Sequence, residues 1–394
     1  MIYLNKIREY YEVILLVIMM IASGSPLQTQ YNSLVTIVYL IGAVMYVVLF
    51  AAHRINRMVF TQIGVLGALL LLTVFSNVDK DIGHYLGVFS MIAATGCVIS
   101  IMPFERFRSL LIDMITIVSI YSVIITLFSN FFPDYPGTLP AIEVGTLKWR
   151  HIGFIYYYWG WHPWMSFIRN SACFREPGVW GCYSVLALAM LIASTREYSK
   201  SDVKKAIIII IGIISSVSTT AVFGLILCCF LYFSQTHKIT IRRLEVLICT
   251  IIIFVLIINK FGNRLFGKLS SSSSSYNSLT ERMDGMNGGI AYFLDHPLFG
   301  SGYTTYLSDT KGTSANSYID ILGKYGLIFS AVVVFGLVLF VLYGKYKTIS
   351  RFVMCLIFLV TLGTQNLILY PLFLGLSFYG YKMNSIYKRG MLYE

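Results

Sequence analysis

The 394-residue sequence has few charged residues, and this scarcity excludes most soluble folds. Asp, Glu, Lys and Arg make up 12% of the chain, against 57% for hydrophobic residues, whereas an average soluble domain has roughly a quarter of its residues charged. So few charges cannot cover a water-facing surface of this length. Apolar stretches recur along the whole chain between short polar joints, as in proteins surrounded by lipid. The sequence therefore predicts a single transmembrane domain over residues 1–394.

Several motifs of soluble catalysis are also missing. The chain has no Walker A loop, no GxGxxG sequence and no GxSxG elbow, so nucleotide-driven chemistry and serine hydrolysis lack support. The seven cysteines include no CxxC pair and the six histidines no HExxH spacing, so we expect no metal site, disulfide framework or cofactor. The net charge of +12 comes from short Lys and Arg clusters between apolar segments, which argues against nucleic-acid binding.

The apolar segments predict a polytopic all-α bundle of about twelve transmembrane helices with both termini in the cytoplasm. A span needs about 20 residues, and the apolar run 206–234 is too long for one span and has a serine-rich middle. We divide it into two short helices, because only a hairpin returns the basic joint that follows to the cytoplasmic side. The predicted spans are 11–22, 34–51, 59–76, 85–102, 110–130, 177–194, two within 206–234, 244–259, 327–343, 352–363 and 367–381.

Two large extracytoplasmic loops with short interfacial helices are predicted at residues 131–176 and 260–326. They contain many cations for translocated segments: Lys148, Arg150, Arg169, Arg175, Lys260, Arg264, Lys268, Arg282, Lys311 and Lys324. Long loops cross a membrane largely regardless of their charge. A solvated loop surface and a site for an anionic ligand therefore both remain open.

Residues 169–178 form the most specific candidate site. The segment enters a predicted helix at Pro177, whose fixed φ suits the first helical turn. Arg175 and Glu176 are then held at the extracytoplasmic end of that helix, where exposed N–H groups and two arginines attract a phosphate or diphosphate. Glu176 is predicted to orient an arginine or to take a proton from a sugar hydroxyl. A helix cap with an ordinary surface ion pair is the alternative.

Aromatic residues crowd the segment 156–164, which includes Trp161. Such side chains either stack on sugar rings or anchor a loop at the membrane interface, and the interface belt is the commoner case. In the second loop, Gly300 and Gly302 allow the backbone to approach a ligand or a neighbouring helix closely.

A short amphipathic helix is expected after Ser314, which would cap it. Its polar face would include Asp320 and Lys324 and would look into the aqueous space shared with the arginines. We expect this helix to lie flat on the outer leaflet, before Gly326 turns the chain back into the bilayer.

Five motifs, spread over roughly the second half of the chain from residue 174 to residue 326, resemble O-antigen polymerases of the Wzy type, in the group that also contains O-antigen ligases. The motifs are Phe-Arg-Glu-Pro-Gly at 174–178, the serine turn at 215–218, Arg282 in a Ser/Thr-rich setting, His-Pro-Leu-Phe-Gly-Ser-Gly at 296–302, and Asn-Ser-Tyr at 316–318 before Lys-Tyr-Gly at 324–326. One departure is Ala315, because members of the group, especially ligases, often have His before that Asn. This favours a polymerase and argues against a mechanism based on His.

The resemblance implies glycosyl transfer at the outer face of a bacterial cytoplasmic (inner) membrane. The donor and the acceptor would both be undecaprenyl diphosphate-linked oligosaccharides, with no cofactor and with a chain-length regulator as a protein partner. The expected catalytic residues are Glu176, Arg175 and Arg282, and the expected substrate-binding residues are Arg169, Arg150, Arg264, His296, Asn316, Tyr318 and Trp161. Alternatives are an O-antigen ligase and a lipid-linked glycan transporter or flippase; internal repeats and mid-membrane charges, which a transporter should have, are not found.

Overall fold

The structure of the protein is a computed structural model that describes residues 2–50, 55–77, 81–144, 147–160, 167–194, 198–234, 276–309, 314–344 and 348–388. The predicted span 244–259, Trp161, Arg264 and the loop cations Lys260, Lys268 and Lys311 lie outside these ranges.

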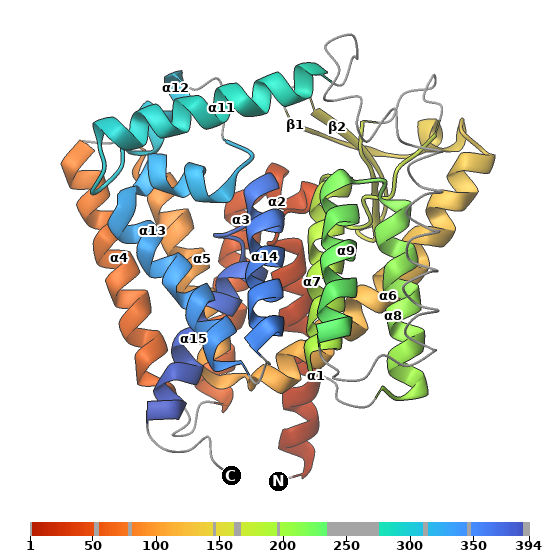
Figure 1. The fold of residues 1–394 in the computed structure, drawn as a ribbon, viewed down its shortest axis with the longest axis horizontal. Helices are drawn as coiled ribbons and strands as arrows, with labels where there is room; N and C mark the ends of the chain where they lie inside the picture. The colour runs from red at the N-terminus through yellow and green to blue at the C-terminus, as the bar shows by residue number, and fades with distance from the viewer. Residues whose placement is uncertain are drawn as a thin grey trace.

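The described chain is a bundle of helices with a small sheet at one end (Figure 1). The helices are α1 (Ile2–Ile21), α2 (Pro26–Gln30), α3 (Asn32–Phe50), α4 (Arg57–Asn77), α5 (Ile82–Ile101), α6 (Phe104–Phe131), a 3-10 turn η1 (Tyr135–Thr138), α7 (Pro177–Ser194), α8 (Lys200–Ser215), α9 (Thr219–Ser234), α11 (Tyr276–Asp295), α12 (Tyr303–Asp309), α13 (Ser317–Tyr343), α14 (Thr348–Thr364) and α15 (Pro371–Lys388). Each predicted span within the described ranges overlaps a helix. The predicted division of 206–234 is confirmed, because α8 and α9 are separated by a turn in which Val217 has φ 44°.

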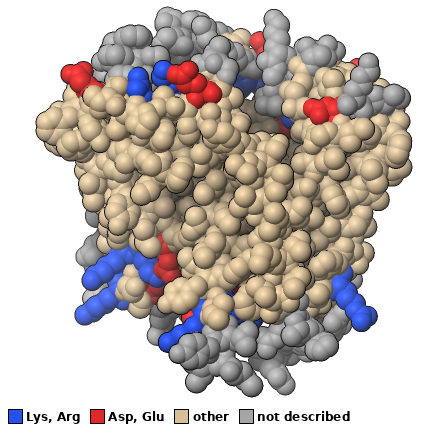
Figure 2. All heavy atoms as spheres, turned by 180° about the vertical axis from the view of Figure 1, so that it is seen from behind, with Lys and Arg blue, Asp and Glu red and all other residues tan. Residues whose placement is uncertain are grey.

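The outer surface of the bundle is that of a multi-pass membrane protein. Charged residues gather at the two ends of the molecule, and the broad middle of the face in Figure 2 shows other residues. Large apolar side chains are exposed on several helices; Val48 of α3, for example, is 77% exposed. By length and hydropathy, α3, α4, α5, α6 and α13 are candidate spans, and Pro177–Ala193, α9 and α14 are shorter apolar helices. The total of twelve spans remains a prediction.

Helix α7 lies at the centre of the bundle. Its side chains are almost entirely buried from Val179 to Ala193, and it packs against α6, α8 and α9. At its upper end in Figure 1, the turn between α1 and α2 is tied to the core: the Tyr183 hydroxyl donates to Ser23 O at 2.8 Å, and Leu372 N donates to Ser23 Oγ at 3.2 Å. The segment that enters α7 contacts the same turn, because Arg175 N donates to Gly24 O.

The first loop contains a three-stranded antiparallel sheet that the sequence reasoning missed. Its strands are β1 (Ala141–Val144), β2 (Leu147–Ile152) and β3 (Tyr156–Tyr158). Arg150 of β2 is paired with Ala141 of β1 and with Tyr158 of β3. The all-α description thus holds for the bundle but not for this loop.

The tyrosines of β3 are fully buried, so neither prediction made for the aromatic segment applies to them. The Tyr156 hydroxyl lies 2.7 Å from Thr126 Oγ1, and the Tyr158 hydroxyl lies 2.7 Å from Ser129 Oγ. Both partners belong to α6, so these side chains attach the sheet to the bundle. They are neither an interface belt nor an exposed surface for sugar rings.

The second loop contains α11 and α12. Figure 1 shows α11 lying across the end of the bundle, opposite the end where α1 begins and α15 finishes. The predicted interfacial helix is wrong in two respects. Its N-cap is Asn316, not Ser314, because the Asn316 side chain accepts hydrogen bonds from the backbone N–H groups of Tyr318 and Ile319. The start of α13 is also buried in protein and does not lie on a leaflet.

Burial of this segment is possible because its two charges neutralise each other. Lys324 Nζ donates to Asp320 Oδ2 at 2.9 Å, and the two residues are 5% and 3% exposed. The predicted turn at Gly326 is confirmed, since Gly326 has φ 76° inside an otherwise continuous helix.

The close backbone approach predicted for the Gly300 region is confirmed, with a helix as the neighbour. A Cβ on Gly300 would lie 2.4 Å from Lys324 C, and one on Gly326 would lie 2.3 Å from Leu298 O. Backbone hydrogen bonds join residues 297–302 to residues 323–327. The turn therefore fixes the position of Lys324 at the kink of α13.

Candidate functional site

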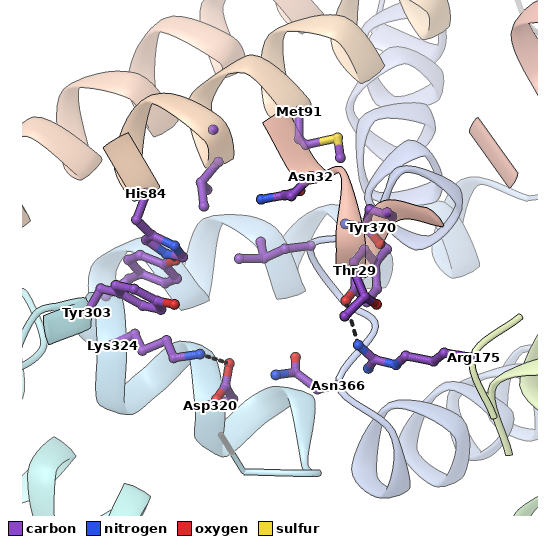
Figure 3. Close-up of a pocket in the computed structure, with 15 residues that line it drawn as sticks. Thr29, Asn32, His84, Met91, Arg175, Tyr303, Asp320, Lys324, Asn366 and Tyr370 are labelled. Carbon is purple, nitrogen blue, oxygen red and sulfur yellow. Dashed lines mark hydrogen bonds and ion pairs between the residues drawn. The ribbon is translucent and has the colours of Figure 1, made fainter. Parts of the chain in front are cut away.

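A polar pocket of about 310 Å³ lies among the helix ends and turns near the sheet. Its walls come from α2, the starts of α3, α5 and α12, the buried start of α13, the segment before α7, and the connection between α14 and α15. The lining residues are Gln28, Thr29, Asn32, His84, Gly87, Val88, Met91, Arg175, Tyr303, Asp320, Lys324, Tyr325, Asn366, Leu369 and Tyr370. Figure 3 shows Arg175 and Lys324 extending into this pocket from opposite sides.

Arg175 is held at three points. Its backbone N–H donates to Gly24 O at 2.9 Å, and its carbonyl accepts a hydrogen bond from Trp149 Nε1 at 2.9 Å. Its Nη1 donates to the Tyr370 hydroxyl at 3.0 Å, with the guanidinium over the Tyr370 ring. The Trp149 contact gives the sheet a role, because β2 carries the indole that clamps the backbone of Arg175.

The charge of Arg175 has no carboxylate within ion-pair distance among the described residues. Its Nε is buried and has no hydrogen-bond partner there. The Tyr370 hydroxyl, followed by the Glu176 carboxylate, raises the pKa of the guanidinium against the opposing effect of burial. A cation that keeps its proton and has donors to spare is suited to a phosphate or carboxylate.

The opposite wall is an aromatic cluster around the Lys324–Asp320 pair. Lys324 Nζ lies 5.6 Å from the centroid of the Tyr303 ring, a distance suited to cation–π attraction. The His84 ring stacks on Tyr303, and His84 Nε2 lies 2.8 Å from the Tyr325 hydroxyl. Because the Lys–Asp pair is neutral as a unit, Arg175 gives the pocket its net positive charge.

Arg282 does not line the pocket but contacts the chain that leads to it. Its Nη1 donates to Thr364 O at 3.3 Å, at the last residue of α14. Asn366, two residues further on, is a lining residue. Arg175 and Arg282 thus contact the same connection, α14 to α15, through Tyr370 and Thr364.

The other predicted cations have structural contacts away from the lining residues. Arg169 Nε donates to Ser216 O at 3.1 Å, and its guanidinium lies over the ring of Trp159. Arg169 therefore contacts the serine turn between α8 and α9. Arg150 Nη1 donates to Leu139 O beside the sheet.

Glu176 directly precedes α7, and the predicted helix start at Pro177 is confirmed. Its carbonyl accepts from Trp180 N in the first turn. No ion pair of Glu176 occurs among the described residues, although its carboxylate influences the pKa of Arg175. The role of Glu176 remains a prediction.

The three remaining predicted residues lie outside the pocket lining. His296 is exposed near the end of α11. Asn316 caps α13, and the Tyr318 hydroxyl donates to Phe358 O at 3.1 Å. Their proposed contacts with substrate remain predictions.

Much of the pocket escaped the sequence reasoning. Gln28, His84 and Tyr370 belong to segments in which no motif was recognised. The sequence feature that pointed to this pocket was the i, i+4 pair Asp320 and Lys324. These two residues were expected to face the same aqueous space as the arginines. That expectation is met for Arg175, which lines the same pocket.

The bundle and its cationic pocket define a multi-pass membrane protein with a polar site at one end of its helices. A family model described as O-antigen ligase matches residues 206–329, and this match supports membership of the group of O-antigen polymerases and ligases. The matched residues include α9, α11 and the buried start of α13, but not Arg175. No curated protein and no solved structure matches the chain.

Proposed function

We propose that the protein is a glycosyltransferase that joins lipid-linked oligosaccharide repeats into a polymer. The donor is a glycan on undecaprenyl diphosphate and the acceptor is a second lipid-linked repeat, at the outer face of a bacterial inner membrane. One observation carries the proposal: Arg175 is a fixed cation with no carboxylate partner among the described residues, in a polar pocket of a membrane bundle. A diphosphate at the edge of the bilayer suits that site in charge and in donor geometry.

In the proposed reaction, a sugar hydroxyl of the acceptor attacks the anomeric carbon of the donor and expels undecaprenyl diphosphate. Negative charge builds on the leaving group, whose release drives the reaction. Arg175 stabilises that charge, and Tyr370 keeps its guanidinium in place. Removing one donor aimed at developing charge typically costs about 3 kcal/mol, or about a hundredfold in rate.

Arg282 and Glu176 are proposed to support Arg175. Arg282 holds the α14–α15 connection through Thr364 O, and that connection supplies Asn366 and Tyr370 to the pocket. Glu176 is close enough to raise the pKa of Arg175, which suits an orienting role. Arg169, which donates to Ser216 O in the serine turn, is proposed to help stabilise the negative charge of the diphosphate.

The test uses purified protein in lipid nanodiscs with lipid-linked repeats as the sole glycan substrate. Wild-type protein is expected to give a ladder of polymer lengths, and Arg175→Ala is expected to extend chains about a hundredfold more slowly. Arg57→Ala, which removes an exposed cation at the start of α4, is the matched control and should give the wild-type ladder. Near-normal polymer lengths from both Arg175→Ala and Glu176→Gln would refute this assignment.

An O-antigen ligase is the second candidate, because the matching family model has that description. A ligase transfers glycan to a lipid A–core acceptor. The same nanodiscs separate the two: a ladder without lipid A–core indicates a polymerase, and product that appears only with lipid A–core indicates a ligase. Ala315, where ligases of the group often have His, favours the polymerase.

A chain-length regulator is the proposed protein partner.

A further inference from the structure

Asp320 presents an unusual buried carboxylate to the pocket. Its side chain is 5% exposed, and Lys324 Nζ donates to Oδ2 at 2.9 Å. The other oxygen, Oδ1, is buried and has no hydrogen-bond partner among the described residues. A buried acceptor without a partner is costly and rare, and it calls for an explanation. A substrate hydroxyl that donates to Oδ1 would supply the missing hydrogen bond.

Among the described residues that line the pocket, no second carboxylate is placed to accept a proton. Asp320 is the sole carboxylate among the residues that the structure places around the pocket. His84 is the other ordinary proton acceptor there, but its Nε2 is engaged with the Tyr325 hydroxyl and its ring is stacked on Tyr303. Glu176 is not a lining residue. Proton acceptance in this pocket therefore points to Asp320.

Lys324 fixes the direction of the Asp320 carboxylate. Both residues lie one helical turn apart on the start of α13, and the ammonium also lies 5.3 Å from the centroid of the Tyr306 ring. The glycine contact at the kink sets the Lys324 backbone. The carboxylate is thus oriented before any substrate arrives, as an efficient general base requires.

We propose that Asp320 is the general base of the transfer and that Lys324 is its positioning residue; this inference rests on the proposed function. The acceptor O–H bond breaks and its proton moves to Asp320 Oδ1. The acceptor oxygen forms a bond to the anomeric carbon while the bond from that carbon to the diphosphate oxygen breaks. The electron pair leaves with the diphosphate beside Arg175, and Asp320 later releases the proton to water. The pocket thus carries a base on one side and a cation for the leaving group on the other (Figure 3).

The decisive experiment compares Asp320→Asn with the double variant Asp320→Asn/Lys324→Met, using turnover and binding of the lipid-linked donor as separate readouts. Loss of a general base typically slows turnover by about 10²- to 10⁴-fold, so Asp320→Asn is expected to bind donor but to extend it at least about a hundredfold more slowly. The double variant removes both charges and should stay inactive. Recovery of turnover in the double variant would show that Asp320 merely neutralises Lys324, and would overturn the proposal.

Chemical rescue adds a second readout. Formate is expected to raise the turnover of Asp320→Ala, because it can occupy the space beside Lys324 and accept the proton, and it should not rescue Arg175→Ala. Asp113→Asn is the matched control: Asp113 of α6 also pairs with a lysine, Lys205 of α8, but lies outside the pocket lining.

The outcomes separate the two proposals. If wild-type protein transfers glycan, Arg175→Ala does not, and Asp320→Asn turns over nearly as fast as wild type, the base assignment falls and the proposed function stands. If the wild-type protein transfers glycan to neither acceptor, both fall.

Discussion

The substitution Gly326→Ala tests whether the close backbone contact at the kink of α13 holds the site together. Gly326 has φ 76° and ψ −178°, a region of backbone space that is essentially restricted to glycine. A Cβ there would also lie 2.3 Å from Leu298 O and 2.5 Å from Gly300 N. Both neighbours are backbone atoms, so no side chain can rotate away to make room. Either the kink or the turn at 297–302 must move.

The expected cost follows from the strain and from the hydrogen bonds at risk. A residue forced into a rare backbone region costs about 1–3 kcal/mol. Backbone hydrogen bonds join Ser301 N to Gly323 O at 2.9 Å and Gly302 N to Lys324 O at 3.2 Å, and each contributes about 1 kcal/mol. Relief of the clash by separating the two segments breaks both bonds. The sum is roughly 3–5 kcal/mol.

Thermal unfolding of purified protein in detergent measures this cost, with Gly64→Ala as the control. Gly64 is also a helical glycine, in α4, but a Cβ there meets no atom within 4 Å, so alanine should be neutral or stabilise by about 0.5–1 kcal/mol. Gly326→Ala should unfold several degrees lower and should lose turnover, because it displaces Lys324. Equal transition temperatures for the two variants would refute the reasoning.

Two further predictions concern the cap of α13 and the orientation of the bundle. Asn316→Ala removes the acceptor for the N–H groups of Tyr318 and Ile319 and should lower the free energy of unfolding by about 1 kcal/mol. Asn316→Asp keeps the cap and should keep activity. A stable but inactive Asn316→Asp variant would instead indicate that Asn316 contacts substrate. Cysteine at Lys148, 51% exposed on β2, should react with an impermeant maleimide in intact spheroplasts, and cysteine at Glu105, 70% exposed at the start of α6, only after permeabilisation. The reverse labelling pattern would contradict the proposed orientation.

The helices could be predicted because hydropathy is a local property. Each apolar run identifies its own helix, and the polar residues around Val217 identify the break between α8 and α9. Gly326 was recognisable for a similar reason, because a glycine after an amphipathic stretch indicates a change of direction. Such features need no knowledge of distant parts of the chain.

The sheet and the burial of α13 could not be predicted, because both depend on distant partners. In β3, the hydroxyls of Tyr156 and Tyr158 contact side chains of α6, far from β3 in the sequence. Asp320 and Lys324 have the spacing of a solvated helix face, and only their mutual ion pair and the aromatic cluster around it allow burial. A solvated helix face and a buried ion pair have the same i, i+4 spacing of charges. The sequence therefore favoured the solvated face, which is the commoner of the two.

The candidate site was predicted in part. Arg175 was singled out, and the structure places it in the polar pocket. Arg282 was expected beside the same ligand, but it donates to Thr364 O, at the edge of the connection that lines the pocket. His84 and Gln28 could not be identified, because their place in the pocket comes from contacts between the first helices and the last.

The order of the pocket walls along the chain determines when the site can exist during synthesis. Arg175 and its partner Tyr370 are 195 residues apart, and Asn366 arrives together with Tyr370. A ribosome-bound chain that has inserted α7 therefore carries an arginine whose pocket still lacks the walls from α12, α13 and the α14–α15 connection. The pocket is complete only when the segment between α14 and α15 has been synthesised, so an unfinished chain has no assembled site.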